Sequence, residues 1–217
     1  MNMNPDLNNF EKLIIEKIRL ITLNEEPAHD FLHFNRVSQM AKKLCALEKA
    51  QIEIVMPAAL LHDFVIVPKN DPRRKVASRL SAEAGIQFLS EISYPKQYFD
   101  QIFHAIEAHS FSANIDTKSL EAKVVQDADR LDGLGAIGIA RCFATAGVLK
   151  RSFYSADDPF CVVRSPDDSL VTIDHFYAKL FKTVDTLKTK SGQLEGSKRV
   201  LVMKKYLDDL KNEILSI

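Results

Sequence analysis

Two histidines in the sequence are placed where they could help to hold a metal ion. His33 shares the apolar stripe of a predicted helix with Val37 and Leu44, so its ring should point inward. A single inward histidine is most often a core residue that one neighbour satisfies. The pair His62-Asp63 is more informative, because it ends an apolar segment just before a loop. Adjacent residues lie about 100° apart within a helix, but at a helix end both side chains can bend toward one ion.

A group of acids supplies further ligand candidates in the segment Asp127-Ala-Asp129-Arg130-Leu131-Asp132. Residues 127 and 129 lie about 200° apart on a helix, so at most one of them faces the core. The alternative is a solvated acidic face that pairs with Arg130. Two imidazoles with two carboxylates would form a mixed nitrogen and oxygen site, which suits Mn, Fe, Co, Ni or Zn better than Mg. No cysteine lies near these residues, which argues against structural zinc.

These residues resemble the HD-domain superfamily of metal-dependent phosphohydrolases. The resemblance is carried by His33 in HDFLHFNRV, His62-Asp63 in AALLHDFV and Asp129 in VVQDADRLDGLGAIGIAR. The segments PKNDPRR, HAIEAHSFSA and DHFYAKLFKTVDTLKTKSG are similar to the small stand-alone bacterial HD proteins, so the resemblance runs from about Glu25 to Glu213.

The resemblance implies a ligand set and a chemistry. It makes one divalent transition-metal ion the expected cofactor, held by His33, His62, Asp63 and Asp129. Asp127 would then lie behind the ligands or at the surface, and Asp63 would also be catalytic. Some relatives are manganese-dependent pyrophosphohydrolases of nucleoside triphosphates. Manganese is therefore the expected ion, with Fe, Co, Ni, Zn or Mg as alternatives.

A basic loop follows the His62-Asp63 pair. Lys69, Arg73, Arg74 and Lys75 stand against the single acid Asp71, a local charge of four minus one, or +3. Arginine grips phosphate through a planar fork and lysine acts as a point charge, so we expect substrate phosphates here. The alternative is an ordinary solvated loop. The resemblance singles out Lys69 as a catalytic and substrate-binding residue and adds Asn70 as a substrate contact, beside Arg73 and Arg74.

His109 and Ser110 are predicted to contact the substrate. His109 shares a helix face with Ile102 and Ile106, and Ser110 begins the following loop. His104 and His109 differ by a net angle of about 140° and cannot face one ion on an unbroken helix. A role for His109 as a ligand to a second metal ion is the alternative, and no adjacent pair of aspartates or histidines supports it.

The elements that must position these residues are helical. Apolar spacings of three and four predict helices over 10–21, 31–45 after the N-cap Asp30, 52–61 with Pro57 inside, 78–92, 95–109, 120–149, 173–188 and 197–215. Residues 64–76 and 150–168 read as loops, with a hint of alternation at 160–163. We predict one all-α HD-domain helical bundle over residues 1–217, with a metal-binding core at about 25–149 and C-terminal helices at 170–217 packed on it.

Composition excludes several classes of protein. Twenty-nine basic and 29 acidic residues give a net charge of zero, so no nucleic-acid partner is expected. Three scattered cysteines fit a reducing compartment. The polar N-terminus and the short apolar runs predict a cytoplasmic protein without membrane contact. A homodimer is left open.

The leading hypothesis is a phosphohydrolase that acts on nucleotides by a metal-activated water, with a small phosphorylated substrate as its partner. Within it, a pyrophosphohydrolase of nucleoside triphosphates ranks first. A 5′-nucleotidase or phosphomonoesterase is the first alternative, and a non-catalytic nucleotide-binding HD regulatory module is the second. An HD oxygenase would need more ligands, and the GYP signature of cyclic-dinucleotide phosphodiesterases is missing.

Overall fold

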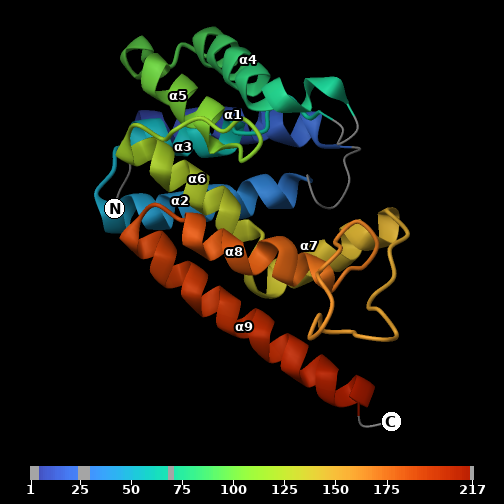
Figure 1. Cartoon of the computed structure of the whole chain (residues 1–217). Coiled ribbons are helices and arrows are strands. Elements are labelled where there is room, and N and C mark those ends of the chain that lie inside the picture. The colour runs from blue at the N-terminus through green and yellow to red at the C-terminus, as the bar shows by residue number, and fades with distance from the viewer. Residues whose placement is uncertain (1–4, 24–29, 68–70, 216–217) are drawn as a thin grey trace. The chain divides into compact units, whose positions relative to one another are not determined.

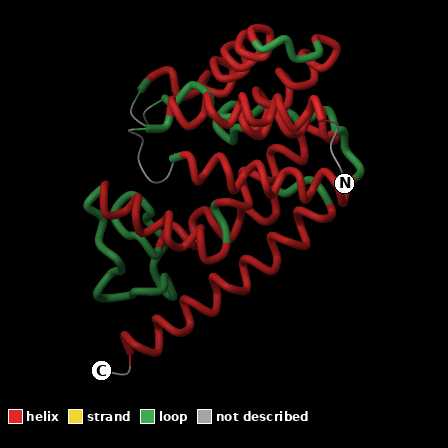
Figure 2. Tube along the Cα trace, turned by 180° about the vertical axis from the view of Figure 1, so that it is seen from behind, coloured by secondary structure: helices red, strands yellow, loops and turns green. Residues whose placement is uncertain are grey.

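The computed structural model describes residues 5–23, 30–67 and 71–215, and most of these residues are helical. Figure 2 shows helices and loops without a strand in the described chain; the nearest approach to a sheet is an isolated bridge between Ser152 and Val171. The predicted all-α class is therefore confirmed. The chain divides into two compact units, Met1–Asp129 and Arg130–Ile217, which are described separately below. The organisation into one domain stays a prediction.

Unit 1 is built around one apolar helix. Its elements are α1 (Pro5–Ile21), α2 (Phe31–Glu48), α3 (Ile52–Leu61), the 3-10 helix η1 (Pro72–Val76), α4 (Ala77–Glu91), the 3-10 turn η2 (Lys96–Tyr98), α5 (Phe99–His109) and most of α6 (Leu120–Asp132) (Figure 1). Helix α3 packs against α1, α2, α4 and α5. Every residue from Ile54 to Leu61 is buried, as an all-round apolar sequence requires.

Helix α3 continues through Pro57, where the sequence allowed a bend or a restart. A proline cannot donate to the carbonyl four residues earlier, so the carbonyl of Glu53 loses its helical partner. The Tyr94 hydroxyl donates to that oxygen at 2.6 Å and replaces the missing bond. This contact lets α3 carry His62 at its C-terminal end without an unpaired carbonyl in its first turn.

Several predicted boundaries differ from the structure. The expected helix over 120–149 is two helices, α6 and α7 (Gly135–Val148). The break has a steric cause: Gly135 has a φ of +73°, and a Cβ at Gly138 would lie 2.2 Å from the Gly133 oxygen. The predicted loop 64–76 contains η1, which Asp71 caps by accepting from the Arg73 amide at 2.8 Å.

Unit 2 contains α7, a π-helical turn η3 (Phe176–Leu180), α8 (Phe181–Thr183), the 3-10 turn η4 (Val184–Thr186) and α9 (Lys190–Leu215). Helix α9 begins seven residues before the predicted Ser197, because the Thr189 hydroxyl accepts from the Gly192 amide at 3.0 Å and starts the helix there. The expected helix over 173–188 is thus a series of short turns. The rings of Phe143, Phe176 and Tyr206 contact one another in the core of unit 2.

The long loop of unit 2, between α7 and η3, is held by two buried aspartates. Asp174 is fully buried and accepts from Arg164 through two guanidinium nitrogens, at 2.5 and 2.6 Å. It also accepts from the Asp167 amide at 2.6 Å. Asp158 accepts from the amides of residues 162, 163 and 164. The loop is therefore ordered by hydrogen bonds, and the alternation at 160–163 forms no strand.

No single helix in the described ranges is long and apolar enough to cross a membrane. The successive helices α6 and α7 reach the required length and hydropathy only when both are counted together across their bend.

Candidate metal centre

Helix ends position the two histidines. The Asp30 carboxylate accepts from the His33 amide at 3.0 Å, which fixes the start of α2 and places His33 in its first turn. Helix α3 ends at Leu61, and His62 follows as its C-cap residue. Both rings are buried, with exposed fractions of 1% for His33 and 0% for His62. The inward direction predicted for His33 is confirmed.

The structure brings all four predicted ligands together within unit 1. The Nε2 atoms of His33 and His62 are 3.2 Å apart. The Asp129 Oδ1 atom lies 3.8 Å from each of these nitrogens. The Asp63 Oδ2 atom is 3.8 Å from His62 Nε2. Of the two acids that periodicity left open, Asp129 is the one that reaches the histidines, while Asp127 is fully buried and its surface alternative is wrong.

His109 extends this cluster on the other side of Asp63. Its ring is 4% exposed, its Nδ1 donates to the Ile106 carbonyl at 2.6 Å, and its Nε2 lies 3.5 Å from Asp63 Oδ1. The predicted inward direction is confirmed. Its substrate contact stays a prediction, and the partner the structure shows is Asp63. His104 instead accepts from the Lys118 amide at 2.9 Å.

The charge states favour metal binding. Burial lowers the pKa of His62 to about 4, with the charge of Asp63 opposing the shift, so the ring is neutral at pH 7. Burial also opposes ionisation of Asp63, but the hydrogen bond to His109 and the nearby imidazoles outweigh it and lower the Asp63 pKa. Burial likewise opposes a charge on His109, yet its bond to Asp63 raises its pKa. The site therefore holds an ionised Asp63 beside a neutral His62.

The donor set fits a divalent cation. The His62 Nδ1 atom lies 2.8 Å from the Ala59 carbonyl, which can only accept, so this contact assigns the hydrogen to Nδ1. The Nε2 lone pair of His62 then faces His33 Nε2 and the carboxylates of Asp63 and Asp129. A shared hydrogen or a cation must lie among these atoms. Two sets of donor atoms, each within 4.8 Å, can hold an ion: His33, His62 and Asp129, and His62, Asp63 and His109.

The basic loop is engaged in local contacts where it is described. Arg73 forms a forked pair with Asp71, with its shortest contact at 2.7 Å, and this pair lowers the pKa of Asp71 to about 2. Arg74 donates to the Val67 carbonyl at 2.9 Å. Lys69 and Asn70 lie outside the described residues. Ser110 follows α5, and its hydroxyl lies 3.0 Å from that of Ser112.

Gln126 is a further buried residue beside the site, and the motifs in the sequence did not indicate it. This side chain is 3% exposed, and its Nε2 donates to the Ala108 carbonyl at 2.8 Å. Its spacing of three residues from Asp129 places both on one face of α6. The spacing from Asp129 could have indicated that Gln126 faces the interior beside the site. A buried glutamine there needs a hydrogen-bond partner.

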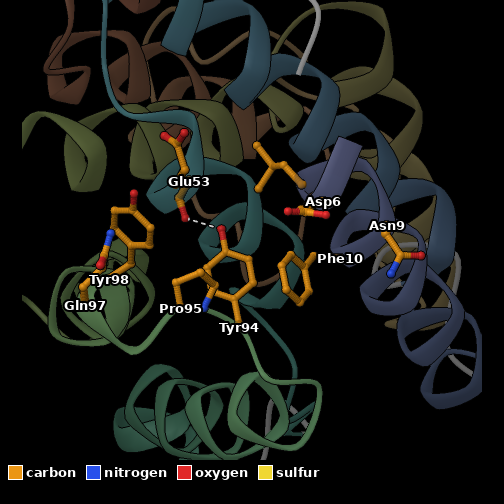
Figure 3. A pocket seen from close by; sticks show the side chains of 9 residues that line it. Asp6, Asn9, Phe10, Glu53, Tyr94, Pro95, Gln97 and Tyr98 are labelled. Atoms are coloured by element: carbon orange, nitrogen blue, oxygen red, sulfur yellow. Dashed lines mark hydrogen bonds between the residues drawn. The ribbon is translucent and has the colours of Figure 1, made fainter. Parts of the chain in front are cut away.

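A cavity of about 340 Å³ lies elsewhere in unit 1. Figure 3 shows its walls, where aromatic rings gather near the Tyr94–Glu53 hydrogen bond. It is lined by Asp6, Leu7, Asn9, Phe10, Glu53, Tyr94, Pro95, Gln97 and Tyr98. Of the predicted site residues that the structure describes, none is among them. We therefore locate the candidate site from its converging donor atoms.

Comparisons with known proteins identify the family of this chain. Residues 31–134 match the model of the HD domain, and this range contains all four proposed ligands. The chain is 31% identical over 204 residues to the uncharacterized protein YpgQ of Bacillus subtilis, covering 92% of this chain and 91% of that protein.

Solved structures agree. The crystal structure of B. subtilis YpgQ in complex with ADP superposes with a TM-score of 0.72 at 32% identity, over 93% of this chain and 98% of that one. An HD-superfamily hydrolase from Bacillus thuringiensis gives 0.74 at 30% identity, over 95% and 97%. With the fold, the matched range and this identity over most of both chains, the protein belongs to the HD-domain superfamily of metal-dependent phosphohydrolases.

Proposed function

We propose that this protein hydrolyses nucleotides, with nucleoside triphosphates as first choice and pyrophosphate as the leaving group. The observation that carries the proposal is the convergence of His33, His62 and Asp129 on one point, with Asp63 beside it. The ADP bound in the YpgQ structure supports a nucleotide ligand. We propose that His33, His62, Asp63 and Asp129 hold one divalent ion, with manganese as the first choice.

A bound divalent ion would lower the pKa of a water and neutralise charge on a phosphoryl oxygen. The chain's own residues prepare that chemistry. The neutral His62 ring offers its Nε2 lone pair without first losing a hydrogen. The ionised Asp63 presents Oδ2 toward His62, while Oδ1 faces His109. Asp63 can therefore orient an attacking water through an oxygen whose direction is fixed.

Charge ranks triphosphates above monophosphates. Histidines bind a metal in their neutral form, so two metal-bound imidazoles and two carboxylates sum to −2 and a divalent ion would make the ligand set neutral overall. Attraction for a polyphosphate must then come from other cations, and the loop over 68–75 supplies a net +3. Because Arg73 is paired with Asp71, the +3 rests on Lys69, Arg74 and Lys75. We expect Lys69 to contact the phosphates first, and Arg73 to do so only after leaving that carboxylate.

The test is a metal-by-substrate panel with product identification. Nucleoside tri-, di- and monophosphates are incubated with Mn, Co, Ni, Zn or Mg, and the products are identified by phosphorus NMR. The expected products from a triphosphate are a monophosphate and pyrophosphate. Asp129→Ala should be inactive, and the control Asp116→Ala, at an exposed loop position, should be unaffected.

Other outcomes would replace the proposal. Efficient turnover of monophosphates with triphosphates ignored would assign a 5′-nucleotidase. Nucleotide binding without hydrolysis of any phosphorylated compound, with every metal, would assign a regulatory binding module.

A further inference from the structure

A buried glutamine connects two of the helices that build the site. Gln126 lies in α6, and its Nε2 donates to the carbonyl of Ala108 in α5 at 2.8 Å. The side chain is 3% exposed. Its other polar atom, Oε1, is buried and has no hydrogen-bond partner in the described part of the chain. This side chain therefore makes one specific bond and leaves its acceptor unused.

The bond falls at a helix end that needs partners. The last four carbonyls of a helix have no intrahelical donor, and α5 ends at His109. The Ile106 carbonyl receives the His109 Nδ1 at 2.6 Å, and the Ala108 carbonyl receives Gln126. Two of these four carbonyls are thus satisfied by side chains at the candidate centre. The end of α5 is fixed to α6 immediately beside His109.

The fixed residue in turn faces a proposed ligand. His109 Nε2 lies 3.5 Å from Asp63 Oδ1, while Asp63 Oδ2 points toward His62. Gln126 stands three residues before Asp129 on the same helix. A shift of the α5 end would therefore turn the Asp63 carboxylate relative to Asp129, the other carboxylate of the cluster.

The unused acceptor indicates that this bond matters for placement. A buried oxygen without a donor costs folding free energy, whereas an apolar side chain of similar size would avoid that cost. What the glutamine gains for its unpaired oxygen is the directed N–H bond to the Ala108 carbonyl, which a leucine would leave without this donor. A leucine can fill the space, but it can neither pair that carbonyl nor fix the helix end.

We propose that Gln126 is a positioning residue: its amide holds the end of α5 so that His109 orients the Asp63 carboxylate toward the ion and the attacking water. The inference rests on the proposed function. It predicts that Gln126 acts through His109 and that its loss lowers kcat while KM changes little, because no substrate contact is removed.

The first test is a double-mutant cycle. Gln126→Leu should lower kcat by about 10–100-fold, the usual loss for partners behind metal ligands. In a His109→Ala background the same substitution should have almost no further effect, because the residue through which it acts is gone. The control Gln87→Leu removes an exposed glutamine that bonds to Glu91, and should change nothing. Equal losses in both backgrounds would overturn the proposal.

The second test needs no activity. Nitrogen NMR of the imidazole rings in the metal-free protein reports hydrogen bonding at each histidine. Gln126→Leu should shift the His109 signals and leave those of His175, which bonds to Asp168 at 2.8 Å in unit 2. Unmoved His109 signals would overturn the proposal even if the protein hydrolyses triphosphates. If the His109 signals shift but the protein has no hydrolase activity, the positioning role of Gln126 would stand and the proposed function would be wrong. If Gln126→Leu fails to fold, Gln126→Met serves in both tests.

Discussion

Two side-chain clusters that contain aspartates, one in each unit, differ in the partners that surround their carboxylates. In unit 2 the Asp174 carboxylate receives a two-pronged arginine and a backbone amide, and the Cys161 thiol lies 3.3 Å away. In unit 1 the lone pair of His62 faces another histidine and two carboxylates, and His109 lies 3.5 Å from the second oxygen of Asp63, Oδ1.

The difference separates a structural cluster from a ligand site. Around Asp174 the protein itself supplies the positive charge and the donors, so nothing further is needed to neutralise that carboxylate. Around His62 the described residues supply mainly acceptors, and the proposed cation would complete the arrangement. Burial and residue type alone would not distinguish the two, because Asp174 is as buried as His62. The two clusters are distinguished by whether the neighbouring groups donate hydrogen bonds and carry positive charge, or accept hydrogen bonds and carry negative charge.

Removal of a ligand should have the largest effect. His62→Ala or Asp129→Ala is expected to lose metal and to lower activity by more than about a hundredfold, beyond the usual loss for residues behind the ligands. The helical content should be unchanged, because the helices are stabilised by their apolar contacts and not by the ligands. Elemental analysis, circular dichroism and kinetics check this. Full metal occupancy in Asp129→Ala with loss in Asp127→Ala would reverse the choice of fourth ligand.

Breaking the other cluster should change stability instead. Asp174→Ala leaves Arg164 without its buried partner, and loss of one member of such a pair costs about 3–5 kcal/mol of unfolding free energy. Because Arg164 is a quarter exposed, we expect the lower end of that range. Urea unfolding at pH 7 measures it. The folded variant should still bind the ion. If Asp174→Ala lost the metal and kept its stability, Asp174 would belong to the metal site and not to a structural cluster.

Metal should stabilise the protein through unit 1. A ligand at about 100 times its Kd adds about 2.7 kcal/mol to the unfolding free energy. Manganese should therefore raise the Tm of the wild type and of Asp116→Ala, but not of Asp129→Ala, and a chelator should reverse the rise. An equal rise in Asp129→Ala would place the ion elsewhere.

Charge outside the cluster should matter less. Lys69→Ala is expected to lower kcat/KM for a triphosphate by an amount equivalent to about 1.5–3 kcal/mol, typical of a hydrogen bond to a charged group. Its metal content should be unchanged, since the lysine contacts phosphate and not the ion. Steady-state kinetics beside metal analysis would show this. Unchanged kinetics for Lys69→Ala, Arg73→Ala and Arg74→Ala together would make the loop a bystander.

Low pH should lower the stability that Asp158 gives to unit 2, within a pH range set by the pKa of this carboxylate. Bonds from the Val162, Val163 and Arg164 amides lower the pKa of Asp158 from 3.8 to about 2. A lowered folded-state pKa contributes stability above the unfolded value and loses it as the pH falls through about 2. Asp158→Asn should therefore be less stable than wild type at pH 7, with a difference that shrinks between about pH 4 and pH 2. Urea midpoints across this range measure it, and a constant difference would contradict the assignment.

Much of the fold and of the cluster could be predicted from spacing. His33 follows an N-cap and His62 ends an apolar helix, and both lie where periodicity placed them. Periodicity could not choose between Asp127 and Asp129, since the angle between them says only that they point apart. The resemblance chose Asp129, and the geometry agrees.

The rest depends on contacts between distant segments. The break between α6 and α7 follows from a close approach at Gly133 and Gly138 that no helical pattern reveals. The His109–Asp63 pair joins residues 46 positions apart, and propensity says nothing about such pairs. The Arg73–Asp71 pair is local, but its formation depends on the turn that Asp71 caps.

The most direct test of the metal centre is anomalous X-ray diffraction from a crystal of the protein grown with manganese. We expect one strong peak within roughly 2.0–2.3 Å of His33 Nε2, His62 Nε2 and one oxygen each of Asp63 and Asp129, near the usual ligand distances for first-row ions. A peak that lies away from His33 and Asp129, or manganese bound only in unit 2, would contradict the account.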